Sequence, residues 1–80
     1  MTVEVTLYTK PECGLCHDVA DALNLLRGRF PHHLVEIDIT QDDELFQRYR
    51  YVIPVVEIGE QTLQAPITIT ELRQALAQVV

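Results

Sequence analysis

The stretch LYTKPECGLCH, residues 7–17, decides the fold, because a predicted β-strand leads there directly into a pair of cysteines. Cys13 and Cys16 are the only cysteines of the chain, and His17 follows the second one. A C-x-x-C pair within a β-α-β pattern is typical of a redox dithiol. C-x-x-C-H is typical of c-type haem attachment, and cysteines with nearby histidines can bind zinc. The surrounding sequence distinguishes between these three kinds of site.

The length and charge of the chain restrict its class and its partners. Its 80 residues favour a single domain over residues 1–80. The formal net charge of −6 would repel nucleic acid and anionic membranes, so we expect neither as a partner. Residues 1–8 alternate between polar and apolar side chains, unlike a secretory signal, and no stretch approaches the length of a transmembrane helix. We therefore expect a cytoplasmic protein, in which a close cysteine pair is more often catalytic or metal-binding than structural.

The first half of the sequence predicts a strand, a helix and a second strand. Polar and apolar residues alternate over residues 2–8, as in a half-buried strand. From Cys16 to Phe30 apolar residues recur every three or four positions, as on one face of a helix, and Gly28 and Pro31 mark its end. The second predicted strand covers residues 33–39. Two strands joined through a helix should be parallel, with a right-handed crossover.

The second half predicts a short helix, a hairpin and a final helix. Residues 40–43 open the short helix, and residues 55–58 and 61–65 are predicted strands separated by a tight turn. The final helix begins at Thr68, which together with Glu71 matches the S/T-x-x-E capping box. The expected fold is therefore α/β, with the order β-α-β-α-β-β-α and a four-stranded mixed sheet that has helices on both faces.

These elements and motifs resemble the glutaredoxin branch of the thioredoxin fold over essentially the whole chain. The strand LYT, Lys10, two further residues and the cysteine pair are similar to the family pattern Y-[TS]-K-x-x-C-x-x-C. Val52-Ile53-Pro54, before the third predicted strand, is similar to the T-V-P of the family, which contains a cis proline. The chain looks closest to a group of small bacterial glutaredoxin-like dithiol proteins. The resemblance implies a thioredoxin-like fold and a redox-active disulfide.

The sequence departs from typical glutaredoxins at two places. Gly14-Leu15 lies between the cysteines, where the family usually has Pro-Tyr. After the fourth predicted strand, Ala65-Pro66-Ile67-Thr68 replaces the two glycines and the acidic residue with which the family binds the γ-glutamyl end of glutathione. We therefore expect no bound cofactor, and glutathione is one candidate reductant among several.

The positions of the two cysteines predict different chemical roles for them. Thiol–disulfide exchange needs an exposed thiolate and a second thiol that resolves the mixed disulfide. Cys13 lies at the predicted helix N-terminus, where free backbone N–H groups and the helix dipole favour a thiolate, and Lys10 adds positive charge. Cys16 lies one turn later on the apolar face, so we expect Cys13 to be the nucleophile and Cys16 the resolving thiol. Glu12 opposes the thiolate, which favours a reductant over a strong oxidant.

Three further residues are predicted to bind the substrate. Proline within a sheet is confined to strand starts and bulges, and Pro54 fits a strand start. The resemblance implies in addition that the Ile53–Pro54 bond is cis and lies beside the dithiol, and that the backbone of Ile53 is free to pair with an extended substrate. Lys10 either binds a substrate carboxylate, glutathione's included, or is a solvated loop residue. The sequence leaves both open.

The sequence argues against haem and zinc at the cysteines. A c-type haem would need an axial ligand opposite His17, and the only methionine is Met1. Zinc would need four ligands, but His32 and His33 point to opposite faces of a strand and lie about 20 Å from the cysteines along the helix. We therefore expect no metal site.

Two alternatives to an enzyme stay open. A thioredoxin-fold binding module would engage a protein partner through the Pro54 region, with thiols that never cycle. A glutathione-dependent iron–sulfur carrier would share a cluster between two chains through Cys13, although the glutathione motif is missing. The interpretation that the sequence favours is a monomeric thiol–disulfide oxidoreductase, whose substrate is a disulfide-containing protein or glutathione.

Overall fold

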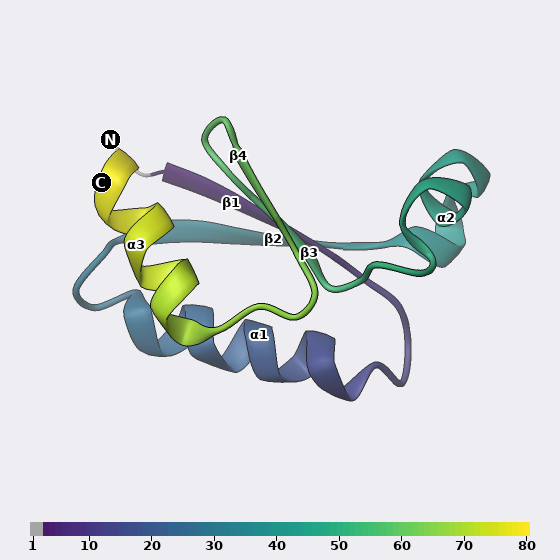
Figure 1. The fold of residues 1–80 in the computed structure, drawn as a ribbon, viewed down its shortest axis with the longest axis horizontal. Coiled ribbons are helices and arrows are strands. Elements are labelled where there is room, and N and C mark those ends of the chain that lie inside the picture. Colours follow the sequence, from purple (N-terminus) through teal and green to yellow (C-terminus); the bar gives the residue numbers. More distant parts are fainter. Residues whose placement is uncertain (1–2) are drawn as a thin grey trace.

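The computed structural model describes residues 3–80, which form one four-stranded sheet and three α-helices (Figure 1). The elements in chain order are β1 (Val3–Thr9), α1 (Gly14–Leu26), β2 (His32–Asp38), the 3₁₀ turn η1 (Ile39–Gln41), α2 (Asp43–Tyr49), β3 (Val55–Ile58), β4 (Gln61–Gln64) and α3 (Ile69–Val79). The predicted β-α-β-α-β-β-α order is confirmed. Thr2, at the start of the first predicted strand, lies outside the described residues.

The strand order places the loop that carries the cysteines at the middle of the sheet. The order is β2-β1-β3-β4, so β1 lies in the interior. β1 and β2 are parallel and are connected through α1, and β3 and β4 form an antiparallel hairpin, as predicted. Gly59 in the hairpin turn has a φ of 59°, a left-handed conformation in which a side chain is unfavourable. Since β1 is interior, the chain leaves its carboxyl end between two neighbouring strands and enters α1 there.

The hydrophobic core lies between one face of the sheet and the helices α1 and α3. Val5 and Leu7 alternate with more exposed residues along β1, and Ile58 and Val56 are in register with them on β3. Apolar residues at helical spacing supply the other side of the core. The buried cluster comprises Val5, Leu7, Val19, Ala20, Leu23, Val56, Ile58, Leu72, Ala75 and Leu76.

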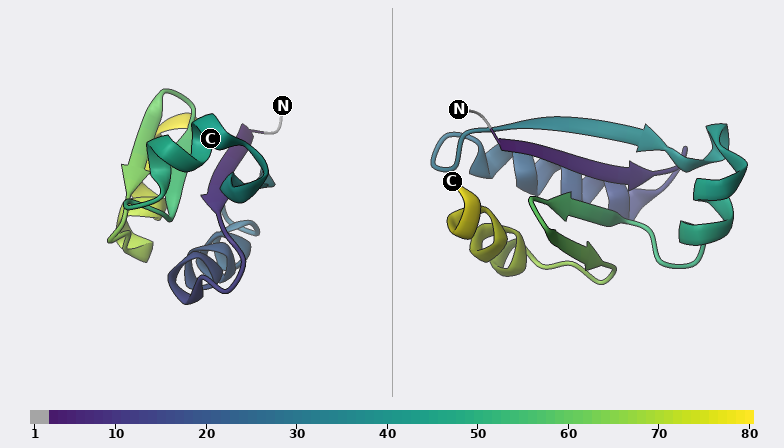
Figure 2. Two further views of the ribbon diagram at one scale, coloured as in Figure 1. Left: turned by 90° about the vertical axis from the view of Figure 1, so that its right-hand side faces the viewer. Right: turned by 90° about the horizontal axis from the view of Figure 1, so that it is seen from above.

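The three helices are distributed unequally over the two faces of the sheet. α1 and α3 lie next to each other and cover one face, whereas α2 lies beyond one end of the sheet (Figures 1 and 2). α2 reaches the opposite face through Tyr49, whose ring centroid is 4.6 Å from that of Tyr8 on β1. The prediction of helices on both faces therefore holds only at this end, because α2, with 7 residues, is too short to cover the rest.

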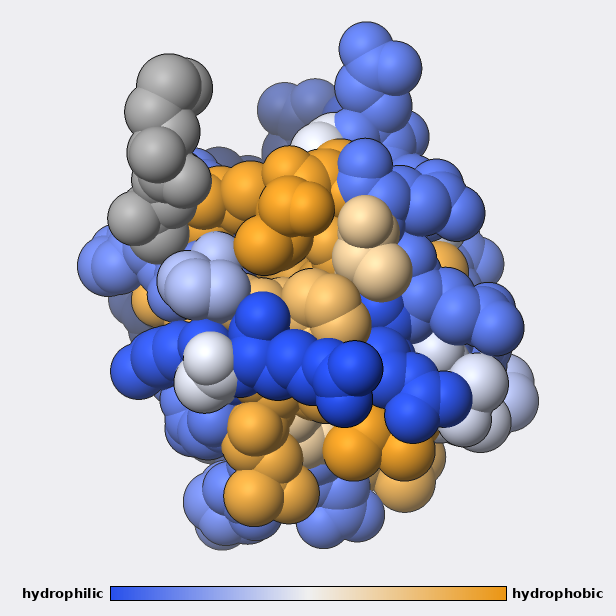
Figure 3. All heavy atoms as spheres, turned by 90° about the vertical axis from the view of Figure 1, so that its left-hand side faces the viewer, coloured by the Kyte–Doolittle hydropathy of each residue, from blue (hydrophilic) through white to orange (hydrophobic). Residues whose placement is uncertain are grey.

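The start of β1 and the end of α3 lie at the same end of the molecule, opposite the end at which α1 begins (Figure 1). Apolar residues gather there above and below a band of hydrophilic side chains (Figure 3). Val79 and Val80, at the end of α3, are among the exposed large apolar residues of the chain. No helix within residues 3–80 combines the length and the hydropathy that crossing a lipid bilayer requires.

Candidate dithiol active site

Cys13 and Cys16 are joined as a disulfide at the start of α1. Their Cα atoms are 5.3 Å apart. The turn from β1 into the helix passes through Glu12, whose φ of 63° places a non-glycine residue in the left-handed region. Cys13 is the N-cap of α1, with φ −95° and ψ 101°, and its Sγ accepts a hydrogen bond from the backbone N–H of Cys16 at 3.2 Å. The sulfur therefore occupies the place that a serine or aspartate oxygen takes in an ordinary N-cap.

The two sulfur-bearing residues differ in their exposure. Cys16 is 2% exposed and faces the core from the first turn of α1, whereas Cys13 is half-buried at the surface. This difference follows from the helix period, because Cys16 is in phase with Val19, Ala20 and Leu23, the other buried residues of α1. A partner from solution can therefore approach Cys13 but not Cys16.

Pro54 lies at the start of β3 and is fully buried beside α1. The Ile53–Pro54 peptide bond is cis. The backbone N–H of Ile53 donates to the carbonyl oxygen of Tyr49 at 3.1 Å, and the N–H of Val52 donates to the same oxygen at 3.0 Å. The expectation that the backbone of Ile53 is free is therefore wrong for its N–H group, which the turn after α2 already uses.

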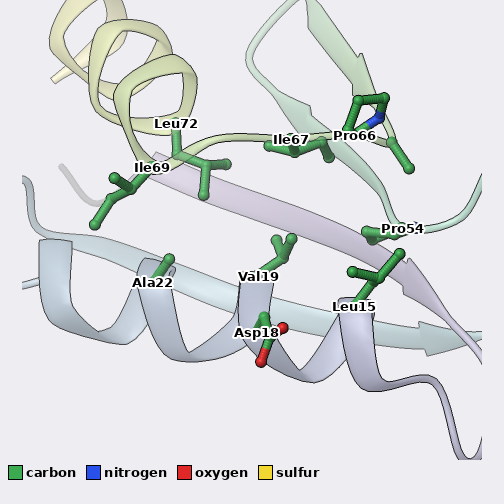
Figure 4. A pocket seen from close by; sticks show the side chains of 10 residues that line it. Leu15, Asp18, Val19, Ala22, Pro54, Pro66, Ile67, Ile69 and Leu72 are labelled. Carbon is green, nitrogen blue, oxygen red and sulfur yellow. The ribbon is translucent and has the colours of Figure 1, made fainter.

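An apolar groove lies on one side of the dithiol, between α1 and the segment that leads into α3 (Figure 4). Its volume is about 290 Å³. Leu15 and Pro54 lie at the end nearest the cysteines, and Ile69 lies at the other end with Ala22. Asp18 is the only charged lining residue. The lining residues are Leu15, Asp18, Val19, Ala22, Pro54, Ala65, Pro66, Ile67, Ile69 and Leu72.

An open hollow of about 510 Å³ is lined by both cysteines and shares Asp18 with the groove. Its charged lining residues are Lys10, Glu12, Asp18 and Glu36, so carboxylates outnumber the lysine, which is the only one of the chain. Lys10 is exposed, and the structure brings it to the same hollow as Cys13, as the sequence predicted for a residue near the dithiol. His17 also lines the hollow and lies 3.7 Å from Asp21.

The N-terminus of α3, where typical glutaredoxins carry their glutathione motif, is closed by its own side chains. The N–H of Thr68 donates to Glu71 Oε1 at 3.0 Å, and the N–H of Glu71 donates to Thr68 Oγ1 at 3.1 Å. This is the predicted capping box. The Ala65–Pro66 bond before it is cis, a feature that no sequence motif indicated. The segment that faces the groove contributes apolar side chains to it, from Ala65, Pro66, Ile67 and Ile69.

The opposite face of the sheet carries a polar pair that the sequence did not predict. The hydroxyl of Tyr8 donates to Glu57 Oε1 at 2.6 Å, across a separation of 49 residues. This hydrogen bond, partial burial and the negative charge of Glu57 raise the pKa of Tyr8 to about 12. Only the pairing of β1 with β3 brings these residues together, and no local pattern indicates it.

The histidines that the sequence analysis weighed as metal ligands lie apart from the cysteines. His32 is buried at the start of β2, and its Nδ1–H donates to the carbonyl oxygen of Phe30 at 2.7 Å. His33, its neighbour, is exposed. Among residues 3–80, no group of three or more His, Cys, Asp or Glu side chains is arranged to hold a metal ion.

A disulfide at the N-terminus of the first helix, beside a proline that opens the third strand of a mixed sheet, defines a protein of the thioredoxin fold. Solved structures are similar to this chain over most of its length. The protein XcR50 from X. campestris matches with a TM-score of 0.80 and 26% identity, covering 95% of this chain and 99% of that one. Thioredoxin O2 from Arabidopsis thaliana, in its oxidised state, matches with a TM-score of 0.75 and 15% identity, covering 98% and 75%.

The particular family follows from the sequence itself. The family model of the glutaredoxin-like domain (DUF836) matches residues 4–77. The chain therefore belongs to the glutaredoxin-like domain family, as the resemblance of its motifs implied. Thioredoxin 1 from Thermosipho africanus, with a TM-score of 0.72, 15% identity and coverage of 94% and 91%, is a further neighbour of the same fold.

Proposed function

We propose that this protein is a thiol–disulfide oxidoreductase in which Cys13 is the nucleophile and Cys16 the resolving thiol. The observation that carries the proposal is the hydrogen bond from the N–H of Cys16 to Cys13 Sγ at the N-terminus of α1. An N–H donor and the positive end of the helix favour a thiolate at Cys13. The burial of Cys16 keeps it away from substrates but within disulfide distance of Cys13.

The reaction proceeds in two exchange steps, and in each of them one S–S bond breaks while another forms. The Cys13 thiolate attacks one sulfur of a substrate disulfide, and the other sulfur leaves as a thiolate that takes up a proton. Cys16 then loses its proton and attacks Cys13 Sγ, which releases the second substrate thiol. The substrate gains two electrons, and the protein ends as the Cys13–Cys16 disulfide. An external thiol, glutathione or a second dithiol protein, reverses the oxidation.

Three further residues contribute to substrate binding in this proposal. Pro54 closes the groove beside the dithiol, and Ile53 lies next to it with a backbone suited to an extended chain. The N–H of Ile53 stays bonded to Tyr49, so the group of Ile53 that would pair with the substrate is its carbonyl oxygen. Lys10, which lines the hollow with Cys13, would contact a carboxylate or carbonyl oxygen of the substrate backbone.

Intact-mass measurement in a series of glutathione redox buffers tests this function. We expect the protein to lose two hydrogens with a midpoint of roughly −270 to −200 mV, between typical thioredoxin and glutaredoxin values. The Cys16→Ser variant should accumulate a mixed disulfide at Cys13, whereas Cys13→Ser should form none. Thiols that stay reduced in every buffer would contradict the proposal and support a binding module. A purified protein that carries a cluster would support an iron–sulfur carrier.

A further inference from the structure

We infer that the substrate of this dithiol is a basic polypeptide segment, with an aliphatic side chain on one side of its cysteine and Lys or Arg on the other, and that glutathione is a poor substrate. The inference rests on the proposed function and adds the chemistry of the substrate. The apolar groove and the acidic hollow, which flank the same disulfide, carry it.

The groove fits an aliphatic side chain better than it fits a peptide carboxylate. Its volume of about 290 Å³ lies at the lower limit of pockets that hold whole small molecules, which suits one or two side chains. Leu15 and Ile69 line it and are 63% and 49% exposed, so a bound apolar group would remove both from water. The groove is therefore an apolar surface that is still exposed to water, and it begins at Leu15, between the two cysteines.

Glutathione lacks binding partners at the same place. It carries two carboxylates and one ammonium group, so its net charge is negative, like that of this protein. Asp18, the only charged residue of the groove, would repel it. The Glu71 carboxylate accepts from the N–H of Thr68 at the start of α3, so a further negative charge lies at this helix N-terminus and disfavours a bound anion.

The hollow that Cys13 lines favours a cation. Glu12, Asp18 and Glu36 line it with Lys10, so its carboxylates exceed its lysine three to one. Neither of the two ion pairs found within residues 3–80 involves any of these four residues. The carboxylates are therefore free to attract a basic side chain of a substrate.

The nearby arginines do not offset this charge. Arg48 pairs with Glu44 at 3.2 Å, and the guanidinium of Arg50 lies over the rings of Phe46 and Tyr51, at 5.1 and 4.6 Å from their centroids. Both therefore have partners within or next to α2, and neither lines the groove or the hollow. A substrate cysteine at Cys13 would place one flanking residue in the apolar groove and the other against carboxylates.

Single-turnover oxidation of the reduced protein by defined disulfides tests this inference. The substrates are symmetric disulfides of short peptides that differ only beside the cysteine, with Leu and Arg, Leu and Glu, or Ser and Arg. Glutathione disulfide and the neutral hydroxyethyl disulfide complete the series. We expect the Leu–Arg peptide to react about tenfold faster or more than the Leu–Glu peptide and glutathione disulfide, with a difference that decreases as salt is added.

Two variants, the first with a matched control, separate the two halves of the inference. Glu36→Lys should lower the rate with the Leu–Arg peptide severalfold, while Glu60→Lys, the same change at an exposed turn residue away from the dithiol, should leave it unchanged. Ile69→Ala should reduce the preference for Leu over Ser. Neither side chain is buried, so both variants should fold.

The series distinguishes failure of the inference from failure of the proposed function. Reaction with hydroxyethyl disulfide but equal rates for all peptides, or fastest reaction with glutathione disulfide, would overturn the inference alone. Reaction with none of the disulfides would overturn the oxidoreductase function and the inference with it.

Discussion

At the scale of single residues, the dithiol is the part of the site that the sequence indicates most directly. Its geometry depends on one turn of helix, since Cys13 caps α1 and the Cys16 N–H bonds to its sulfur. A spacing of three residues at a helix start determines that contact locally. The hydrogen bond of the Ile53 N–H to Tyr49 is different, because it depends on how the turn after α2 closes. Residue patterns contain no signal for it, and the prediction for this group was accordingly wrong.

The Tyr8–Glu57 hydrogen bond predicts a dependence of stability on alkaline pH. Its formation raises the pKa of Tyr8 from 10.0 to about 12, so the folded state holds the phenol proton more tightly than the unfolded state. This stabilisation is fully present below about pH 10 and is lost as the pH rises through about 12. We expect on the order of 1 kcal/mol, less than the full shift implies, because solvent screens a pair near the surface.

Urea unfolding of the wild type and Tyr8→Phe at several values between about pH 8 and pH 12 measures this contribution. The variant should be less stable at the lower values, and the difference should disappear towards the upper limit. Tyr51→Phe serves as the control, because Tyr51 is 85% exposed and its loss should change nothing. If the difference in unfolding free energy between wild type and Tyr8→Phe is independent of pH, the hydrogen bond to Glu57 does not raise the pKa of Tyr8.

At the scale of elements, the boundaries that the sequence missed share one physical cause. The apolar repeat included Phe30 in the face of the first helix, with Gly28 and Pro31 marking its end, whereas α1 ends at Leu26. Phe30 still packs against the core, because the turn after the helix keeps its side chain on the same side. Similarly, Ile39 was assigned to the second strand, yet it lies in η1 and is fully buried. Apolar periodicity reports which side chains are buried, whereas backbone hydrogen bonds determine where an element ends.

The cap of α3 is an element whose contribution can be measured. Thr68 and Glu71 stabilise the first turn of α3 through their reciprocal hydrogen bonds. This turn places Ile69 and Leu72 in the groove. Replacement of Thr68 by Ala should cost about 1 kcal/mol of unfolding free energy, because the N–H of Glu71 loses its acceptor. Thr70→Ala, two residues later and exposed, makes the same chemical change outside the cap and should cost less than about 0.5 kcal/mol. Equal losses in denaturant unfolding of the two variants would contradict a capping role.

At the scale of the whole molecule, the groove is the feature that the sequence did not reveal. The predicted elements, their order and the dithiol follow from local patterns and from motif spacing. The groove needs α1 and the segment from Ala65 to Leu72 to lie face to face, which only the packing of both helices on one sheet face achieves. The sequence did show that Ala65-Pro66-Ile67-Thr68 departs from the glutathione motif. It could not show that this segment forms an apolar wall next to Leu15.

The dependence of the whole fold on one core leads to a final prediction about stability. A chain of 80 residues buries a modest core, and its unfolding free energy should be about 4–12 kcal/mol. Leu23 on α1 is completely buried within the core cluster, whereas Leu25 on the same helix is 78% exposed. Leu23→Ala should therefore cost about 2–5 kcal/mol, from lost burial and from the cavity left behind. Leu25→Ala, the same chemical change, should cost less than about 0.5 kcal/mol.

Thermal unfolding of both variants, with the disulfide kept intact, measures the difference. A loss of this size at Leu23 should lower the melting temperature by roughly 8–40 degrees, whereas that of Leu25→Ala should stay close to the wild type. The same variants also test the position of the dithiol, because α1 carries Cys13 and Cys16 on its first turn while its later turns hold it against the sheet. If Leu23→Ala unfolds no earlier than Leu25→Ala, the face of α1 that packs on the sheet differs from the one described, and the burial of Cys16 on that face fails with it.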